Sequence, residues 1–484
     1  MPGSNTAREG SYLLDCPSEI ISSILLSCSR ADHLRLSRVN KQLNTVANRL
    51  LYSTVQFRWT APDTFEALTN PPVTIFLRTI LGNPQLAVLV RSLRLVGNGS
   101  FWHHWRAHES LPTRSWAGTG STVDRAAALV AELPLSYTAD WLRGLEVGTM
   151  DAIIAFLLTR LQNLRSFVTK ANFTKEMSLQ MAMLRSALCG RNQVGWPPRS
   201  GQLEQVSADF YRNYDVQCDT NTDTLLPFFY LPAIQALDLR LDHPARFAWP
   251  AAAAPDCTTL TSLTLRHVRE SALKEILSCT KRLAKLDWQF FYSERNMTTL
   301  QIGDALLYPP IADLDVLVDA LTPIRDTLKD LTIRAHAIQP VQLEYQTPIE
   351  VRGSLEGLVD FPKVERFEVP LPFLAGRLVP NNRFRVSERI PQNLRMLVFN
   401  DGLQEFADSM LDLDEWNYDE IASNLRDWLL YEDAGSSTPF MRQLELGLVS
   451  GAWEGGLYSK LKRLLGTERV PVRVTICGKE MEYG

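Results

Sequence analysis

Apolar residues recur at helical spacing along the first fifty residues of the chain. Pro17 opens the first such pattern and predicts a helix over residues 18–28, because a proline at a helix start loses no hydrogen bond. Asp32 is a suitable N-cap for a second, short helix. A third amphipathic pattern covers residues 39–52. Three helices this short bury little apolar surface among themselves, so we expect an exposed apolar stripe that a partner covers.

After residue 59 the pattern changes to short strand-like segments of the form L-x-x-L-x-L. Three fixed apolar positions recur by chance on the order of a dozen times in a chain of this composition, so the triplets need support from their context. Helical patterns over residues 271–279 and 313–328 lead into the next triplet and predict alternation of helix and strand. The clearest triplets are Val90/Leu93/Leu95, Leu142/Leu145/Val147, Ile234/Leu237/Leu239, Leu260/Leu263/Leu265, Leu283/Leu286/Trp288, Leu328/Leu331/Ile333, Val364/Phe367/Val369, Leu394/Leu397/Phe399 and Met441/Leu444/Leu446.

The spacing of these triplets is typical of leucine-rich repeats in only part of the chain. Middle positions 237, 263 and 286 are 26 and 23 residues apart, within the roughly 20 to 29 residues of that repeat class. The later steps, to 331, 367 and 397, lengthen to 45, 36 and 30 residues. The predicted fold is therefore a small all-α module followed by an irregular α/β leucine-rich-repeat-like solenoid. The predicted parts are a mobile tail at 1–12, the helical module at 13–59, and the solenoid at 60–484 with an aromatic insertion loop at 96–122.

In such a solenoid the triplet residues point inward, and the alternate strand residues face the concave surface. We expect the charged members of this set to hold a target protein, although any solvated strand shows a similar mixture of charges. The predicted target-binding residues are Arg94, Asp238, Arg240, Arg266 and Arg334, and the same face is expected to carry Glu146, Thr264, Thr332, Glu368 and Asn400.

The composition narrows the class of protein. Hydrophobic residues make up 45% of the 484 residues and charged residues 21%, values typical of folded globular chains. The formal charge of −4, without a run of basic residues, lacks the footprint of a nucleic-acid partner. The longest apolar stretches, such as residues 152–158, fall far short of the roughly 20 residues that a bilayer span requires. We therefore expect neither a nucleic-acid partner nor a membrane-embedded segment.

No motif for catalysis or metal binding stands out. The seven cysteines form no C-x-x-C pair and no Cys/His group at zinc spacing, which predicts reduced thiols in the cytoplasm or nucleus. His104 and His108 have the i, i+4 spacing of a helical metal site, but Pro112 and nearby glycines favour a loop. The acidic stretch at residues 408–420 lacks the order of a calcium loop. We expect no cofactor, no metal and no enzymatic activity, with scattered catalytic groups as the open alternative.

The first helical segment resembles an F-box. The run from Cys16 to Ile20, the pair Ile24-Leu25 and the run from Asp32 to Lys41 follow the family pattern Leu-Pro-x-Glu-Ile, Ile-Leu, Asp-Leu-Leu and Val-Cys-Lys, without a gap over residues 13–52. The resemblance implies docking on the Skp-type adaptor of a cullin-based ubiquitin ligase, with Val39 and Leu43 inside the module. The adaptor contacts that it implies are Pro17, Ile20, Ile24 and Leu34.

Four residues depart from the F-box pattern: Cys16, Cys28 and His33 stand in place of leucines, and Asn40 in place of a cysteine. They leave open a chain whose module no longer docks and which serves as a protein-binding solenoid scaffold. A further alternative is that the three helices only cap one large domain. With its loose L-x-x-L-x-L units and the run at residues 391–397, the chain is similar to a large group of fungal F-box proteins. That resemblance implies a substrate receptor that holds a target for ubiquitin-dependent degradation.

Overall fold

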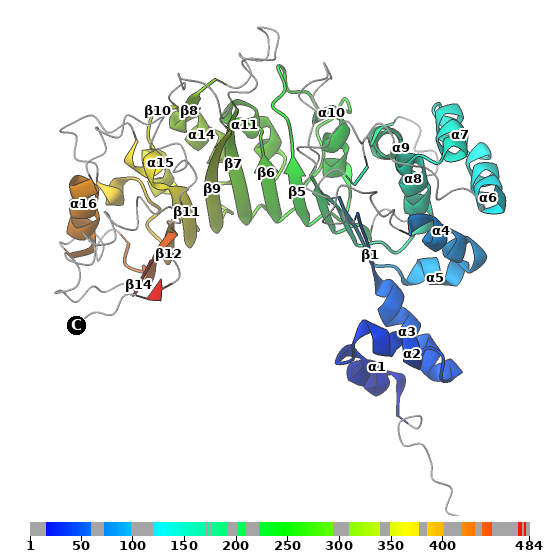
Figure 1. Cartoon of the computed structure of the whole chain (residues 1–484). Helices are drawn as coiled ribbons and strands as arrows, with labels where there is room; N and C mark the ends of the chain where they lie inside the picture. Colours follow the sequence, from blue (N-terminus) through cyan, green and yellow to red (C-terminus); the bar gives the residue numbers. More distant parts are fainter. Residues whose placement is uncertain are drawn as a thin grey trace, which may run out of the picture. The chain divides into compact units, whose positions relative to one another are not determined.

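The computed structural model of the chain comprises two compact units, Met1–Phe210 and Tyr211–Gly484 (Figure 1). Each unit combines helices with parallel strands, so a helical N-terminal region is followed by an α/β region. The structure describes residues 16–59, 72–97, 120–170, 173–174, 177–190, 202–209, 222–293, 309–338, 349–376, 385–400, 418–430, 438–447, 473–476 and 479–480.

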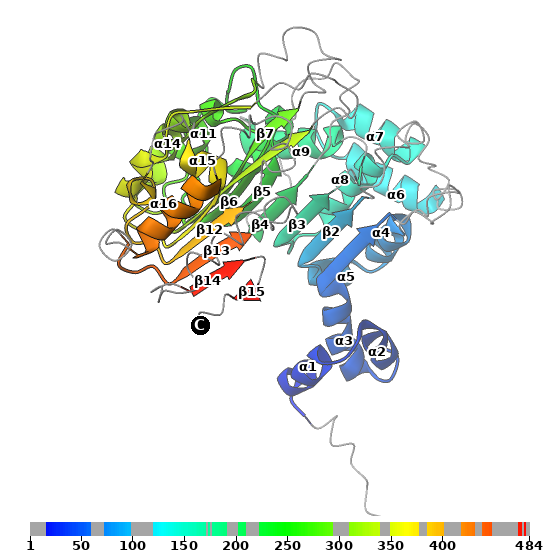
Figure 2. The same ribbon diagram turned by 60° about the vertical axis from the view of Figure 1, so that its left-hand side comes forward.

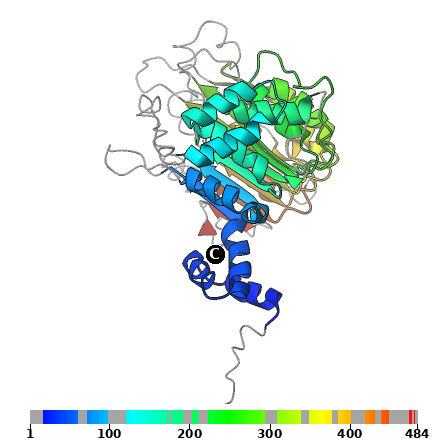
Figure 3. The same cartoon turned by 90° about the vertical axis from the view of Figure 1, so that its right-hand side faces the viewer.

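The first three helices form the small all-α module that the sequence predicts (dark blue in Figures 1 and 3). Ile21 and Leu25 of the first helix pack with Leu43 and Val46 of the third to form its core, and all four are at most 3% exposed. The module continues directly into a strand at Thr54, so its helical part ends at Ser53 rather than at residue 59. The helices are α1 (Ser18–Leu26), α2 (Arg30–Leu36) and α3 (Lys41–Ser53).

The helix caps of the module correct one prediction. Ser29, not Asp32, is the N-cap of α2: the Ser29 hydroxyl accepts a hydrogen bond from the Asp32 N–H at 3.2 Å. The Asp32 carboxylate in turn accepts from the Ser29 N–H at 3.3 Å, which completes a capping box. A sequence pattern that finds the acidic residue of such a box three positions inside the helix can mistake it for the cap.

The first unit continues with four parallel strands that pair in chain order, β1 with β2, β2 with β3 and β3 with β4. Because β1 pairs with β2 over its whole length, residues 54–58 belong to this sheet and not to the helical module. The strands are β1 (Thr54–Arg58), β2 (Ser92–Val96), β3 (Ser166–Lys170) and β4 (Gln205–Ala208). The helices between them are α4 (Val73–Gly82), α5 (Pro84–Leu89), α6 (Gly120–Ala131), α7 (Thr138–Val147), α8 (Met150–Arg160) and α9 (Ser178–Cys189).

Two predictions for the first unit are wrong. The triplet Leu142/Leu145/Val147 lies on helix α7, because its first two apolar residues, three apart, also fit a helix face. Glu146 is therefore a helical residue and lines no strand. Of the predicted insertion loop at 96–122, Val96 is the last residue of β2, residues 120–122 form the start of α6, and residues 98–119 lie outside the described residues.

A buried carboxylate joins helices α8 and α9. Asp151, in the first turn of α8, accepts hydrogen bonds from the Leu179 N–H at 2.8 Å and from the Gln180 N–H at 3.2 Å. Its carboxylate also accepts from the side chains of Ser178 at 3.1 Å and Gln180 at 3.0 Å. Burial raises the pKa of Asp151, and these hydrogen bonds act against that shift. The carboxylate thus satisfies the free N–H groups at the start of α9.

Replacing Asp151 with asparagine is expected to lower the free energy of unfolding by about 2 kcal/mol, because an amide NH₂ would then face a buried N–H donor. The matched control is Asp140→Asn on α7, whose exposed carboxylate pairs with Arg143 of its own helix. That change should cost less than about 0.5 kcal/mol. Hydrogen exchange of the α9 backbone amides measures the loss of stability in both variants. Equal protection of these amides in Asp151→Asn and Asp140→Asn would contradict the prediction.

The second unit contains a large parallel sheet whose strands pair in the order β5-β6-β7-β9-β11-β12-β13-β14, with β15 antiparallel at the end (Figure 2). These strands are β5 (Ala236–Arg240), β6 (Ser262–Arg266), β7 (Lys285–Ser293), β9 (Asp330–Ile338), β11 (Arg366–Pro370), β12 (Met396–Asn400), β13 (Gln443–Gly447), β14 (Arg473–Ile476) and β15 (Lys479–Glu480). A separate parallel pair joins β8 (Ile311–Asp313) to β10 (Glu350–Arg352).

The helical segments of this unit connect successive strands. Helix α11 follows β6 and precedes β7, which confirms the helix predicted over residues 271–279. The segments are α10 (Thr222–Leu225), η5 (Leu226–Tyr230), α11 (Glu270–Ser278), α14 (Leu314–Leu321), η6 (Thr322–Ile324), η7 (Glu356–Asp360), α15 (Leu371–Ala375), η8 (Val386–Glu388) and α16 (Tyr418–Leu430).

Register explains why the triplets recur. The middle residue of each triplet lies beside that of the next strand, so one buried apolar row crosses the sheet from Leu237 to Leu444. A polar row beside it runs from Asp238 through Asp287 to Glu368. One face of the sheet therefore packs against helices, and the other presents polar side chains.

Candidate functional site

The first candidate surface is the apolar side of helix α1 and its neighbour α2. Pro17, Ile20 and Ile24 are spaced three and four residues apart and so share one side of α1. Ile20 is 49% exposed and Ile24 46%, while Ile21 of the same helix is completely buried. Leu34 of α2 is likewise 49% exposed. The structure thus leaves all four predicted adaptor-contact residues accessible. Their exposure is energetically unfavourable in the isolated chain, because a large aliphatic side chain gains free energy by leaving water.

Two further exposed apolar side chains were not expected. Val39 is 64% exposed, so its predicted place inside the module is wrong, whereas Leu43 is buried as predicted. The reason is that Asn40 is the N-cap of α3, which leaves Val39 outside the helix whose apolar face forms the core. Leu26, the last residue of α1, is 70% exposed. The sequence pattern gave no signal for this exposure, because it predicts a helix that continues to residue 28, whereas α1 ends at Leu26.

The residues that depart from the F-box pattern have structural roles inside the module. Cys16 and Cys28 are partly buried and pack against the core of α1 and α3. The Nε2 atom of His33 lies 2.6 Å from the carbonyl oxygen of Leu25, near the end of α1. Asn40 accepts a hydrogen bond from the Leu43 N–H at 2.8 Å. The four residues that depart from the pattern therefore stabilise the three helices, and they do not cover the exposed apolar side chains of α1 and α2.

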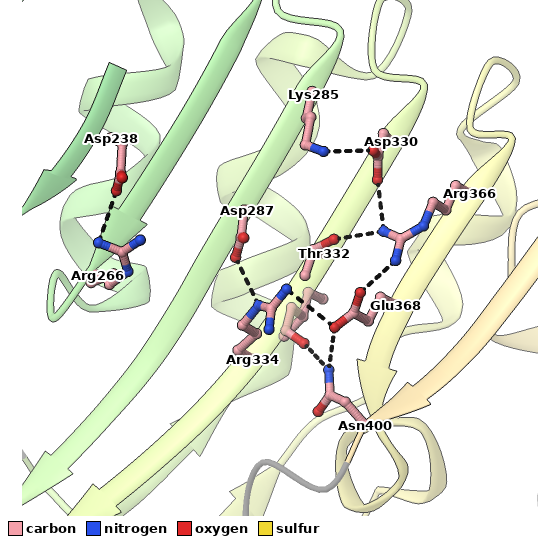
Figure 4. Close-up of polar contacts among 11 residues, drawn as sticks. Asp238, Arg266, Lys285, Asp287, Asp330, Thr332, Arg334, Arg366, Glu368 and Asn400 are labelled. Carbon is pink, nitrogen blue, oxygen red and sulfur yellow. Dashed lines mark hydrogen bonds and ion pairs between the residues drawn. The ribbon is translucent and has the colours of Figure 1, made fainter. Parts of the chain in front are cut away.

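The second candidate surface is the polar face of the sheet in the second unit (Figure 4). Its charged residues, together with Thr332 and Asn400, form ion pairs and hydrogen bonds that we call the polar ladder, in which the Asp238–Arg266 pair stands apart from the other members. Arg366 bonds Glu368 at 2.6 Å and Asp330 at 3.1 Å, and Arg334 pairs with Glu368 at 3.4 Å. The polar ladder comprises Asp238, Arg266, Lys285, Asp287, Asp330, Thr332, Arg334, Arg366, Glu368 and Asn400.

The strand register brings opposite charges together in the polar ladder. Arg266 on β6 pairs with Asp238 on β5 at 2.8 Å, and Arg334 on β9 pairs with Asp287 on β7 at 3.3 Å. Burial raises the pKa of Asp287, and Arg334 and Arg266 act against that shift. Because acids and bases alternate across the strands, this face offers a patterned surface with little net charge. Such a pattern favours selectivity over strong electrostatic attraction.

The predicted target-binding residues fall into three environments. Arg94 is exposed on β2 of the first unit. Asp238, Arg266 and Arg334 lie on the polar face of the second unit with partly exposed side chains. Arg240 is only 7% exposed, which corrects its expected place on an accessible surface. Its Nε–H donates to Nδ1 of His267 at 3.4 Å, so a neighbouring loop covers it, and no pattern within its own strand signals that cover.

The described residues contain no group of three or more side chains suited to hold a metal ion. Among the same residues, no helix has the length and apolar character to cross a bilayer. His103, His104, His108 and the acidic residues at 408–417 lie outside the part of the chain that the structure describes.

Comparison with known proteins bears on the helical module alone. A search of the curated proteins finds no matching relative. A scan against protein-family models matches residues 13–52 to the F-box domain. This match covers α1, α2 and nearly all of α3, the helices that leave Ile20, Ile24 and Leu34 exposed. The chain therefore carries an F-box domain at its N-terminal end.

Proposed function

We propose that the chain is the substrate-recognition subunit of a ubiquitin ligase of the Skp–cullin–F-box type. The observation that carries this proposal is the coincidence of the F-box match at residues 13–52 with accessible apolar side chains on α1 and α2. F-box domains typically bind Skp-type adaptors, and through such an adaptor this chain would reach a cullin. The Pro17, Ile20, Ile24 and Leu34 side chains are the proposed adaptor contacts.

The physical basis of docking would be the burial of these side chains. Full burial of an isoleucine or leucine is worth roughly 1.5–3 kcal/mol, so covering the exposed half of each contributes about 1 kcal/mol. The inward packing of Cys16 and Cys28 supports docking over a scaffold that has lost it, because the exchanged residues do not interrupt the exposed set.

In the same proposal, the polar ladder of the second unit contacts a target protein. Arg266 and Arg334, whose side chains are 31% and 49% exposed, are the first candidates for such contacts. The large parallel sheet with helix-strand units supports an irregular leucine-rich-repeat-like solenoid of the kind found in fungal F-box proteins. Ubiquitin transfer would be catalysed by other subunits, in the cytoplasm or nucleus, so this chain would need no cofactor and no catalytic residue.

The double variant Ile20→Asp, Ile24→Asp is expected to weaken adaptor binding at least about 100-fold. Each aspartate would have to be buried without a partner at the interface, at a cost of about 2 kcal/mol or more. The measurement is the dissociation constant of the full chain with a purified Skp-type adaptor, by calorimetry or co-precipitation.

The matched control is Ile75→Asp, Val88→Asp, which places the same two charges at exposed apolar positions of α4 and α5, outside the F-box match. It should bind the adaptor like the wild type. Equally weak binding by the wild type and the Ile20/Ile24 variant would reject the receptor function and favour the scaffold. Circular dichroism of each variant verifies that the helices persist.

A further inference from the structure

Two thiols far apart in the sequence lie next to each other in the second unit. Cys257 precedes strand β6, and Cys279 is the C-cap of helix α11, so the two residues border one strand-helix segment. Their Sγ atoms are 3.3 Å apart, and neither cysteine forms a disulfide in this structure. A disulfide bond needs an Sγ–Sγ separation of about 2 Å, so a movement of about 1 Å would join them.

The two thiols differ in access to solvent. Cys257 is completely buried, whereas Cys279 is partly exposed. Each is already held near its neighbours: the Cys257 thiol lies 3.6 Å from the Phe229 carbonyl oxygen, and the Cys279 thiol 3.1 Å from that of Ile276. The hydrogen bond with Cys279, together with burial, raises the pKa of Cys257. Cys279 is therefore the thiol that a dissolved oxidant reaches first.

We propose that Cys257 and Cys279 form a redox-sensitive pair that closes to a disulfide when hydrogen peroxide oxidises the protein. The thiolate of Cys279 attacks one peroxide oxygen, the O–O bond breaks, and water leaves after protonation, so Cys279 becomes a sulfenic acid. The Cys257 sulfur then attacks Sγ of Cys279. The S–S bond forms as the S–O bond breaks, and the displaced hydroxide takes the Cys257 proton to leave as water.

The step balances: the two thiols lose two electrons and two protons, and one peroxide becomes two water molecules. A low-molecular-weight thiol reverses it by thiol–disulfide exchange. The bond would connect the entry of β6 to the end of α11 and so close one strand-helix segment covalently. Because β6 carries Arg266 of the polar ladder, oxidation would stabilise that part of the candidate target-binding face.

Peptide mapping of the full chain tests the pair directly. The protein is treated with hydrogen peroxide, its remaining thiols are alkylated, and it is digested with trypsin. Cleavage at Arg246, Arg266, Lys274 and Lys281 places Cys257 and Cys279 on different peptides, 247–266 and 275–281. We expect these two peptides to appear joined, with a mass lower than their sum by two hydrogen atoms, and to separate on reduction. The melting temperature should rise by on the order of 5 °C on oxidation.

Single variants separate the two chemical steps. In Cys257→Ser, Cys279 should accumulate as a sulfenic acid that dimedone traps, and in Cys279→Ser no joined peptide should form. The inference is overturned if peroxide leaves both wild-type cysteines open to alkylation, joins either one to a different cysteine, or oxidises Cys279 further without joining it to Cys257. The mapping uses the wild-type chain, so a folding defect in a variant does not affect it.

Discussion

The Arg269→Ala variant is expected to lower the free energy of unfolding of the second unit by about 3–5 kcal/mol. Arg269 precedes α11, and its side chain is only 2% exposed. Its guanidinium bonds the Glu270 carboxylate at 3.0 and 2.9 Å and lies over the ring of Phe290, with Cζ 4.4 Å from the ring centroid. It also donates to the carbonyl oxygens of Pro309 and Ile311, which connects α11 to the segment before α14.

The size of this effect follows from what the variant leaves behind. Glu270 is 9% exposed and would keep a buried negative charge whose remaining described partner is the Asp313 N–H at 3.4 Å. The partly buried carbonyl groups of Pro309 and Ile311 would also lose this donor. Removing the unpaired Glu270 charge should therefore restore part of the stability. The double variant Arg269→Met, Glu270→Gln is expected to have a higher free energy of unfolding than Arg269→Ala.

Arg334→Ala is the matched control, because Arg334 also pairs with carboxylates but is 49% exposed. Glu368 keeps its bond to Arg366 in that variant, so the expected loss is below about 1 kcal/mol. Hydrogen exchange of the β6 and β7 amides measures the free energy of opening in all variants. If these amides lose protection equally in Arg269→Ala and Arg334→Ala, the buried Arg269–Glu270 pair does not stabilise the second unit more than an exposed pair does.

The strands of the second unit could be predicted because their residues repeat one simple arrangement. Leu263 and Leu265, for example, are both buried in the core, and Thr264 between them faces the other way. The L-x-x-L-x-L pattern did not predict β3 and β4. The last position of the pattern is Thr169 in β3 and Ala208 in β4, which are buried at 1% and 0% exposure but are not large aliphatic residues. It also misassigned the triplet on α7, because apolar spacing alone does not distinguish a short strand from one side of a helix.

The candidate site could be predicted only in part, for a related reason. Helical periodicity cannot separate exposed Ile20 from buried Ile21, so the adaptor contacts depended on the F-box resemblance. The burial of Arg240 and the approach of Cys257 to Cys279 depend on segments about 20 residues or more away in the sequence. Contacts of that kind exist only once the strands are in register, and no local pattern encodes them.

The same burial that hides Arg269 makes the second unit sensitive to acid through His243. The backbone N–H of Arg269 donates to Nδ1 of His243 at 3.4 Å, and the Ser271 hydroxyl oxygen lies 3.3 Å from Nε2 of the same imidazole. Burial, reinforced by the Arg269 charge and opposed by Glu270, lowers the pKa of His243 from 6.5 to about 4. The folded state therefore keeps the imidazole neutral over a pH range in which the unfolded chain binds a proton.

Stability should consequently be complete above about pH 6.5 and be lost as the pH falls toward about 4, by about 3 kcal/mol from this group. His267, whose pKa burial holds well below 6.5, acts in the same direction. The measurement is the unfolding free energy of wild type and His243→Gln between pH 7 and 5, above the range where most carboxylates titrate. The variant should show a shallower pH dependence of this free energy than the wild type. Parallel curves for wild type and His243→Gln would show that His243 does not couple folding to pH.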